Sequence, residues 1–249
     1  MIAIQDALNI IQNSIKSTSK TEVKKLSDAL HYVLSEDVKS PINMPPFRQS
    51  AMDGYALNMH DETTYTVVGE VKAGDNAQPD LQPGEAVRIF TGAPVPDSAN
   101  AIIIQEHVTV TDEVLTANKP VNLNANIRSL GEQVREDDVA LDKGTKLTSA
   151  AIGFLATLGL TEVYVYSRPE ICIIVTGNEL IKPGEELLYG QIYESNAEML
   201  TVELSRVGFT NVTVKKVGDN YQRTVHVLSL IHISEPTRHI CLSRMPSSA

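Results

Sequence analysis

Two junctions between an apolar strand and a Thr-Gly turn place polar groups where a ligand site is expected. The apolar run at residues 171–175 leads directly into Thr176-Gly177-Asn178-Glu179. A buried strand that ends in such a turn, with a carboxylate at its mouth, is where an open α/β sheet usually builds a ligand site. The run at residues 86–90 leads in the same way into Thr91-Gly92. We therefore expect two walls of a polar site, although neither turn alone names a substrate.

Three carboxylates stand at positions from which they can bind a cation. Asp53 follows a proline-rich linker within Ser50-Ala51-Met52-Asp53-Gly54-Tyr55-Ala56. Its Asp-Gly pair is a turn signal, and a simple turn is the first interpretation. The functional alternative is a carboxylate that binds hydrated Mg²⁺ through oxygen. Glu179 and Asp219 follow neighbouring strands and can share a metal ion, but Asp219 fits a helix N-cap with Asn220 equally well.

Hydroxyl, backbone and guanidinium groups offer sites for an anion. Thr91 supplies a hydroxyl, and the adjacent glycine permits close approach to the backbone, although a barrel corner explains this turn equally well. Arg88 precedes Thr91 closely, but strand alternation leaves its direction open. Arg128 and Arg135 flank Gly131 in a loop. Arginine suits phosphate or oxyanion binding. The alternative is a solvent-exposed loop whose charges have no binding role.

Several common nucleotide-binding, hydrolase and metal-binding motifs do not occur in the sequence. There is no GxxxxGK[ST], GxGxxG or GxSxG segment, so motif-based assignments to P-loop, dinucleotide-binding and hydrolase proteins fail. The six histidines are scattered without ligand spacing, and two distant cysteines give neither a disulfide framework nor a zinc pattern.

The first half of the chain changes character at its prolines. Apolar periodicity predicts helices over residues 4–15 and 26–34. Pro41, Pro45 and Pro46 then mark an extended linker. From 45 to about 140 the sequence predicts a β-rich inserted domain, consistent with a small barrel, with strands at 65–71, 85–90, 101–105 and 108–115.

The second half of the chain predicts a βαβ unit. A helix at 149–158 and a short strand at 163–166 come first. A strand at 171–175, a helix opened by Ser195 with capping-box spacing, and a strand at 211–217 then make a right-handed parallel crossover. A further helix starts near Asn220. The expected fold is therefore multidomain α/β plus β: 1–44 completed by 141–169, an insertion at 45–140, an incomplete α/β domain at 170–228, and a tail at 229–249.

Charge and hydropathy narrow the class of protein. The formal net charge is −10, which argues against a general nucleic-acid or anionic-membrane surface. It leaves an anionic substrate open, because a bound divalent cation or local arginines reverse the field at a site. Apolar runs are far shorter than a bilayer span, and no signal peptide is visible at Met1. We expect a cytoplasmic protein.

Taken in order, the motifs resemble the molybdopterin molybdenumtransferase (MoeA) family, which includes the C-terminal domain of gephyrin. The resemblance covers roughly residues 1–228. The matching segments are Pro45-Pro46-Phe47 with the Ser50-to-Ala56 heptapeptide, Arg88-Ile89-Phe90-Thr91-Gly92-Ala93-Pro94, Asn126-Ile127-Arg128 with Gly131-Glu132, Arg168-Pro169, Thr176-Gly177-Asn178-Glu179-Leu180, and Gly190-Gln191-Ile192-Tyr193-Glu194-Ser195-Asn196.

The resemblance implies an activity and partners. Family members take molybdate and adenylylated molybdopterin, use Mg²⁺, and release AMP with the finished molybdenum cofactor. It implies a homodimer whose cleft lies between the β-rich domain of one subunit and the molybdopterin-binding α/β domain of the other. An upstream molybdopterin adenylyltransferase would supply the substrate, and molybdoenzymes would accept the product.

The resemblance also implies roles for particular residues. Catalytic roles fall to Asp53, Thr91 and Glu179, and Asp219 joins Asp53 and Glu179 as a metal ligand. Cofactor binding falls to a larger set: Arg128, Thr176, Gly177, Ser195 and Asn196. Gln133 stands where the family has an aspartate, and Asn178 where it often has Asp.

From about Ser229 the chain no longer resembles the family. A second glycine- and serine-rich stretch and a final β-barrel domain are not found, so we expect a truncated homologue with impaired activity. The alternatives are a non-catalytic scaffold or dimeric interaction module on the same fold, and a different transferase or hydrolase on a similar α/β sheet. The segment around Asp53 speaks against the last, because a lone α/β domain would not carry it.

Overall fold

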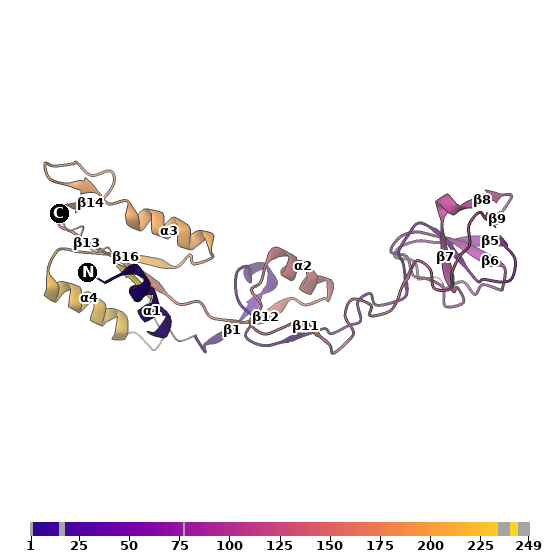
Figure 1. The fold of residues 1–249 in the computed structure, drawn as a ribbon, viewed down its shortest axis with the longest axis horizontal. Helices are drawn as coiled ribbons and strands as arrows, with labels where there is room; N and C mark the ends of the chain where they lie inside the picture. The colour runs from indigo at the N-terminus through magenta and orange to yellow at the C-terminus, as the bar shows by residue number, and fades with distance from the viewer. Residues whose placement is uncertain (1, 15–17, 77, 234–239, 244–249) are drawn as a thin grey trace. The chain divides into compact units, whose positions relative to one another are not determined.

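A computed structural model describes residues 2–14, 18–76, 78–233 and 240–243 (Figure 1). The chain divides into two compact units. One consists of Met1–Glu36 with Asp142–Ala249, and the other of Asp37–Leu141. The second unit is therefore inserted into the first. Within the described residues, no helix is long and apolar enough to cross a membrane.

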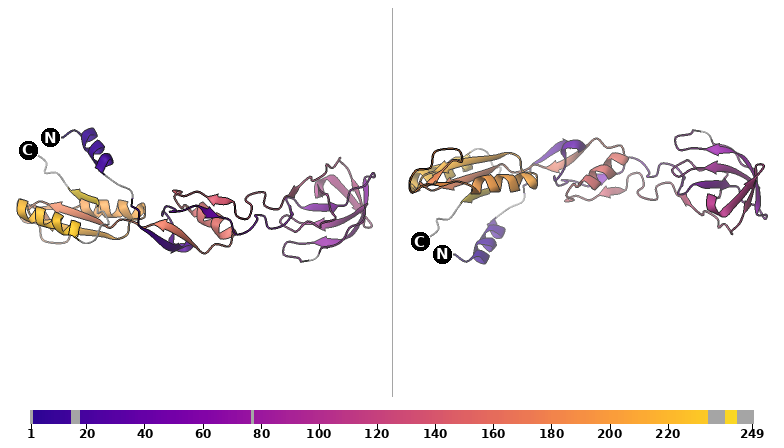
Figure 2. Two further views of the ribbon diagram at one scale, coloured as in Figure 1. Left: turned by 90° about the horizontal axis from the view of Figure 1, so that it is seen from below. Right: turned by 90° about the horizontal axis from the view of Figure 1, so that it is seen from above.

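The inserted unit is built around a six-stranded sheet that curls on itself (Figure 2). The strands run in the order β7 (Ala101–Ile104), β4 (Gly54–Leu57), β6 (Glu85–Ile89), β5 (Thr64–Val71), β9 (Val114–Ala117) and β8 (Val108–Thr111). Every neighbouring pair is antiparallel except β5 with β6. The short 3₁₀ helix η2 (Gln105–His107) follows β7.

Both faces of the neighbouring strands β7, β4 and β6 are largely buried, in keeping with the apolar residues that make up most of their sequences. Ala56, Val87 and Ile102 belong to one core cluster. Their chain neighbours Leu57 and Ile103 belong to another on the opposite face. The period-two alternation of a strand thus supplies two cores from one sheet.

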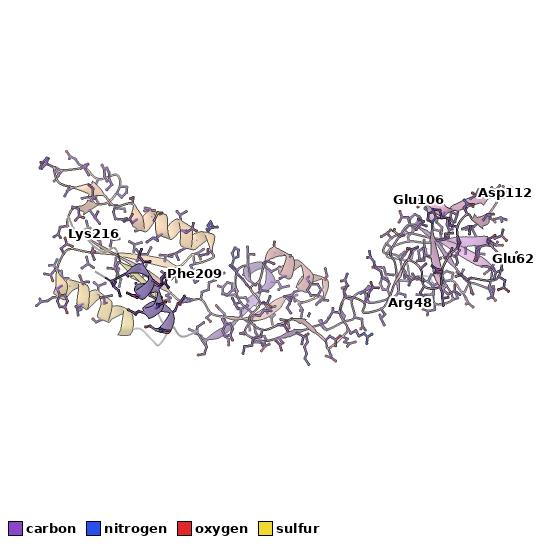
Figure 3. The ribbon with its side chains drawn as sticks, in the orientation of Figure 1. Arg48, Glu62, Glu106, Asp112, Phe209 and Lys216 are labelled. Carbon is purple, nitrogen blue, oxygen red and sulfur yellow. The ribbon has the colours of Figure 1, made fainter. Side chains whose placement is uncertain are left out.

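Short ladders attach the linker to this unit. β2 (Val38–Lys39) pairs with β11 (Val139–Leu141), and β3 (Gln49–Ser50) pairs with β10 (Ile127–Arg128). Arg48, labelled in Figure 3, donates hydrogen bonds to the carbonyl oxygens of Pro96, Asp97 and Ala99. These contacts hold the residues before Asp53 against the loop that follows β6.

The other unit contains a part made of helices and a two-stranded antiparallel ladder. α1 (Ile4–Ser14) comes first, and β1 (Thr21–Lys25) pairs antiparallel with β12 (Glu162–Tyr166). The 3₁₀ helix η1 (Leu26–Asp28) and α2 (Ser149–Thr157) lie beside this ladder. Thr148 caps α2 by accepting a hydrogen bond from the Ala151 N–H at 3.2 Å.

The same unit contains a parallel α/β sheet. β13 (Ile171–Thr176) lies between β16 (Val212–Val217) and β17 (Ile240–Ser243), and both pairings are parallel. α3 (Asn196–Arg206) covers one face and α4 (Tyr221–Ile233) the other (Figure 1). A separate two-stranded ladder joins β14 (Leu180–Ile181) to β15 (Ile192–Tyr193). The parallel βαβ unit predicted from the sequence is present.

Arg168 links the two parts of this unit. Its guanidinium lies 3.7 Å from the centre of the Tyr32 ring. It donates hydrogen bonds to the carbonyl oxygens of Leu30 and of Gly208, the latter just after α3. Arg168 therefore connects the segment that follows η1 to the end of α3.

Three local predictions are wrong. Residues 26–34 do not form a helix, because Leu26 continues from β1 into η1 and Leu34 bridges Val165 on β12. Strand pairing overrides the helical spacing there. Residues 108–115 are not one strand, because positive φ angles at Asp112 and Glu113 turn the chain between β8 and β9. Asp112 is labelled at this turn in Figure 3.

The third error concerns the start of α3. Ser195 makes no capping hydrogen bond. The preceding Glu194 accepts one from the Ala197 N–H at 2.9 Å. The carboxylate at the helix start thus replaces the hydroxyl that the capping-box spacing predicts.

The C-terminal segment is more regular than its sequence predicts. Of the predicted tail at 229–249, residues 229–233 continue α4 and Ile240–Ser243 form β17. Residues 234–239 and 244–249 lie outside the described residues.

Gly54 has no room for a side chain. A Cβ atom added there would lie 2.0 Å from the carbonyl oxygen of Ile103 on the neighbouring strand β7. We predict that Gly54→Ala lowers the free energy of unfolding by about 1–3 kcal/mol or more, since the backbone of a central ladder must move. Urea unfolding followed by circular dichroism measures this.

Gly69→Ala is the matched control for that prediction. Gly69 also lies in the sheet, on β5, but no heavy atom lies within 4 Å of its added Cβ. We expect its free energy of unfolding to change by less than about 0.5 kcal/mol. Equal losses in the two variants would contradict the steric account.

Candidate functional site

Three strand ends meet at one edge of the six-stranded sheet. β4 runs antiparallel to β6 and β7, so its start lies beside the ends of both neighbours. Asp53 directly precedes β4, Thr91 follows β6, and Gln105 follows β7. The edge therefore collects polar residues from three distant parts of the sequence.

Thr91 holds the Asp53 carboxylate with two hydrogen bonds. The Thr91 N–H donates to Asp53 Oδ1 at 2.7 Å, and the Thr91 hydroxyl donates to the same oxygen at 2.8 Å. The Gln105 N–H donates to the Asp53 carbonyl oxygen at 3.2 Å, which fixes the backbone as well. Asp53 and Thr91, which the sequence offered as separate candidates, are thus in direct contact.

These bonds favour the charged form of Asp53. The Thr91 N–H, then its hydroxyl, and more weakly the positive charge of Arg88 hold the pKa of the Asp53 carboxyl below its ordinary value. The side chain is exposed. Among the described residues Oδ2 has no hydrogen-bond partner, so one anionic oxygen faces solvent at neutral pH.

Buried Ser50 connects the turn before β4 to the turn after β6 by hydrogen bonds. Its N–H donates to the Ala93 carbonyl at 3.0 Å, and its own carbonyl accepts from the Gly92 N–H at 2.9 Å. Its hydroxyl donates to the Met52 carbonyl at 2.6 Å. Gly92 has φ +86, a conformation that glycine adopts without strain. The residues on both sides of the Asp53–Thr91 contact are therefore fixed by backbone bonds.

Arg128 lies on a strand that pairs with the same segment. β10 places Arg128 opposite Gln49, and the Ala51 N–H donates to the Asn126 carbonyl at 3.0 Å. The Arg128 side chain is exposed. The structure thus brings the predicted arginine loop to the residues that lead into Asp53. Gln133, in the same loop, donates its backbone N–H to the Met44 carbonyl at 2.9 Å.

Arg88 and Gln105 were not assigned to the site from the sequence. The Arg88 guanidinium lies 4.9 Å from the centre of the Tyr55 ring and 5.2 Å from that of Phe90, and it donates a hydrogen bond to Gln105 Oε1. Strand alternation left the direction of Arg88 open. Its partner Tyr55 on β4 was the missing information, because register decides which side chains share a face.

The second predicted wall lies after β13. Thr176 is the last residue of that strand, and buried Gly177 has φ +139. A Cβ on Gly177 would lie 2.8 Å from Glu179 Oε2. Glycine therefore lets the exposed Glu179 carboxylate fold back over the strand end.

Asn178 and Asp219 join the carboxyl ends of β13 and β16. The Asn178 N–H donates to Asp219 Oδ2 at 3.3 Å, and the Asp219 N–H donates to Asn178 Oδ1 at 3.2 Å. Asn220 accepts from the Arg223 N–H at 3.0 Å and so caps α4. Asn220, not Asp219, therefore caps α4. The Asp219 carboxylate instead accepts a hydrogen bond from Asn178, just beyond the end of β13.

Ser195 and Asn196 lie at the start of α3, just beyond β15. The parallel ladder places Glu179 before β14 and Ser195 after β15, at opposite ends of the two-stranded pair. No described hydrogen bond joins Ser195 or Asn196 to Glu179 or Asp219. Their predicted role in cofactor binding therefore remains a prediction.

The donor set fits Mg²⁺ better than a metal that needs a protein cage. No group of three or more His, Cys, Asp or Glu side chains gathers in the described part of the chain. Mg²⁺ is commonly held by one or two carboxylates, with water and substrate phosphates completing its shell. A fixed carboxylate with one free oxygen, as at Asp53, suits that mode of binding.

The low pKa of Asp53 can be tested at Thr91. Thr91→Val removes the hydroxyl bond but keeps the backbone N–H bond, so we predict that the pKa of Asp53 rises toward its ordinary value. Stability from these bonds is present above the unfolded pKa and is lost as pH falls through the folded pKa. A carbon-detected NMR titration of the Asp53 carboxyl measures the shift.

The control for that titration is Thr116→Val, which removes an exposed hydroxyl from β9. It should leave the pKa of Asp53 unchanged. An Asp53 pKa in Thr91→Val equal to that of the unmodified protein would show that the hydroxyl does not stabilise the carboxylate.

Comparisons with known proteins cover most of the chain. The family model for the MoeA N-terminal region (domain I and II) matches residues 2–159. A molybdopterin molybdenumtransferase from Haemophilus influenzae is 34% identical over 224 residues, which cover 88% of this chain and 55% of that protein. Molybdopterin molybdenumtransferase 2 from Mycobacterium tuberculosis is 34% identical over 228 residues, covering 88% and 56%.

Solved structures agree. The crystal structure of the molybdopterin biosynthesis MoeA protein from Pyrococcus horikoshii OT3 has a TM-score of 0.81 and 31% identity, covering 96% of this chain and 65% of that one. The chain spans about half the length of the curated relatives it matches. On the family match and the shared fold, this chain belongs to the MoeA family.

Proposed function

We propose that this protein acts in molybdenum cofactor biosynthesis as a molybdopterin molybdenumtransferase. It would insert molybdate into adenylylated molybdopterin and release AMP. Curated relatives carry that transferase name. The observation that carries the proposal is the Asp53 carboxylate, held in its charged form by two Thr91 hydrogen bonds with one oxygen free.

Asp53 would hold Mg²⁺ in this reaction. When bound, the ion supplies positive charge that neutralises the phosphoanhydride of the adenylylated substrate. The protein's own contribution is orientation. The Thr91 hydroxyl donates its hydrogen bond to Asp53 Oδ1 and thereby fixes the carboxylate. Cleavage of a phosphoanhydride requires mainly positioning and charge stabilisation, which a preorganised carboxylate and nearby arginines provide.

Arg128 would bind an oxyanion of the substrate. Its guanidinium is exposed, and the pairing of β10 with β3 places it near the segment before Asp53. Arginine binds planar pairs of oxygens through two N–H groups. We assign Arg128 to the phosphate or molybdate end of the substrate on that chemistry.

The α/β sheet would bind the pterin part of the substrate. Thr176 and Gly177 form the end of β13, and exposed Glu179 and Asp219 offer carboxylates for metal binding beside it. Ser195 and Asn196 are assigned to the same cofactor on the resemblance alone. This position follows the general rule that open α/β sheets bind ligands outside the carboxyl ends of their strands.

The proposal includes an assembly and a cellular setting. We propose a homodimer in the cytoplasm that receives adenylylated molybdopterin from a molybdopterin adenylyltransferase and passes the cofactor to molybdoenzymes. The expected domain organisation, with segments at 1–44 with 141–169, 45–140 and 170–228, is part of the same proposal. A dimer that binds no molybdopterin would favour the non-catalytic scaffold instead.

Replacement of Asp53 tests the proposed chemistry. We predict that AMP release from adenylylated molybdopterin requires molybdate and Mg²⁺, and that Asp53→Ala lowers its rate about 10²-fold or more, the scale for loss of one oriented electrostatic group. Chromatographic quantification of AMP measures the rate.

The matched control is Asp61→Ala, which removes another exposed carboxylate from the same unit. It should release AMP at the unmodified rate. AMP release by Asp53→Ala at the same rate as Asp61→Ala would remove Asp53 from the site, and absence of release from the unmodified protein would contradict the proposed activity.

A further inference from the structure

Arg88 is held rigidly at the same sheet edge as Asp53. The rings of Tyr55 and Phe90 lie 4.9 and 5.2 Å from its guanidinium carbon, and Gln105 Oε1 accepts one of its N–H groups. Stacking on aromatic rings and a hydrogen bond together restrict a side chain that is otherwise flexible. Arg88 is therefore oriented before any ligand arrives.

Strand register places Arg88 opposite Tyr55, near the end of the sheet at which Asp53 lies. Arg88 is the partner of Tyr55 across the β4–β6 ladder, so their side chains share a face. Phe90 directly follows β6, with its ring 5.2 Å from the Arg88 guanidinium carbon, and Asp53 directly precedes β4. The positive charge of Arg88 contributes to the low pKa of Asp53, in agreement with this placement.

The charge of Arg88 is not neutralised by an ion pair. No carboxylate of the described residues lies within ion-pair distance of Arg88. Guanidinium has five N–H donors, and one described hydrogen bond occupies a single one of its groups. The half-buried Arg88 guanidinium keeps unused N–H donors, and its positive charge acts on the exposed Asp53 carboxylate. A positive and a negative group therefore lie near each other.

Adjacent opposite charges that do not pair with each other suit a ligand that carries both. We propose that Arg88 binds a tetrahedral oxyanion whose divalent counter-ion is held by Asp53. The proposal deepens the proposed function by assigning to Arg88 either the phosphate of the adenylyl group or molybdate. Both are tetrahedral oxyanions that accept hydrogen bonds from arginine.

Direct titration of the intact chain separates the two sources. Isothermal calorimetry with AMP plus Mg²⁺ forms one arm, and molybdate plus Mg²⁺ forms the other. We expect Arg88→Gln to raise the dissociation constant at least about tenfold in one arm, which identifies the oxyanion bound. Arg88→Lys keeps the charge but loses the planar stacking and should give an intermediate value.

Lys72→Gln provides the control for net charge. Lys72 is an exposed cation in the same unit, and its loss changes the formal charge by the same amount. Its dissociation constants should equal those of the unmodified protein. The salt dependence of binding should weaken in Arg88→Gln alone, a change that a purely structural role does not produce.

The outcomes decide the proposal separately from the proposed function. Equal binding by Arg88→Gln and Lys72→Gln in both arms, or no binding of either oxyanion by the unmodified protein, overturns the role of Arg88. If circular dichroism shows that Arg88→Gln is unfolded, the dissociation constants of Arg88→Lys and the unmodified protein decide whether Arg88 binds the oxyanion. Binding that depends on Arg88 without AMP release supports this inference and contradicts the transferase proposal.

Discussion

The Asp53–Thr91 contact is the interaction on which the site in the inserted unit depends. Asp53 is exposed and would otherwise sample many rotamers. Two donors on one oxygen fix the carboxylate and favour its charged form, while the second oxygen stays open to solvent. A carboxylate prepared in this way binds a hydrated cation without paying to reorganise. Loss of one donor would weaken both the orientation of the carboxylate and the preference for its charged form.

The surrounding sheet serves that contact. Close approach of β4 and β7 at Gly54 brings the residue before β4 to the sheet edge, and Ser50 ties the linker to the turn after β6 through two backbone hydrogen bonds. The Arg88 guanidinium, which lies close to the Tyr55 and Phe90 rings, adds positive charge at the same end of the sheet. Cation-binding and anion-binding groups thus come from rigid strands and their immediate ends, which gives more precise placement than a long loop.

The strand ends that carry chemistry could be predicted from the sequence because each combines an apolar run with a glycine turn. β6 before Thr91 and β13 before Gly177 were both found in this way. What the sequence did not contain was register. The direction of Arg88, the turn at Asp112 and the strand pairing of Leu34 all depend on partners distant in the chain. Asp219 shows the same limit, since its contact with Asn178 depends on two strands ending side by side.

Paramagnetic mapping of the cation site tests the central claim most directly. With Mn²⁺ as a probe in place of Mg²⁺, the account predicts strong broadening of the amide NMR signals of Asp53, Thr91 and Gln105 in the intact chain. In Asp53→Asn that local broadening should be lost. Broadening spread over the acidic surface, or unchanged in Asp53→Asn, would contradict the claim that Thr91 prepares Asp53 as a cation ligand.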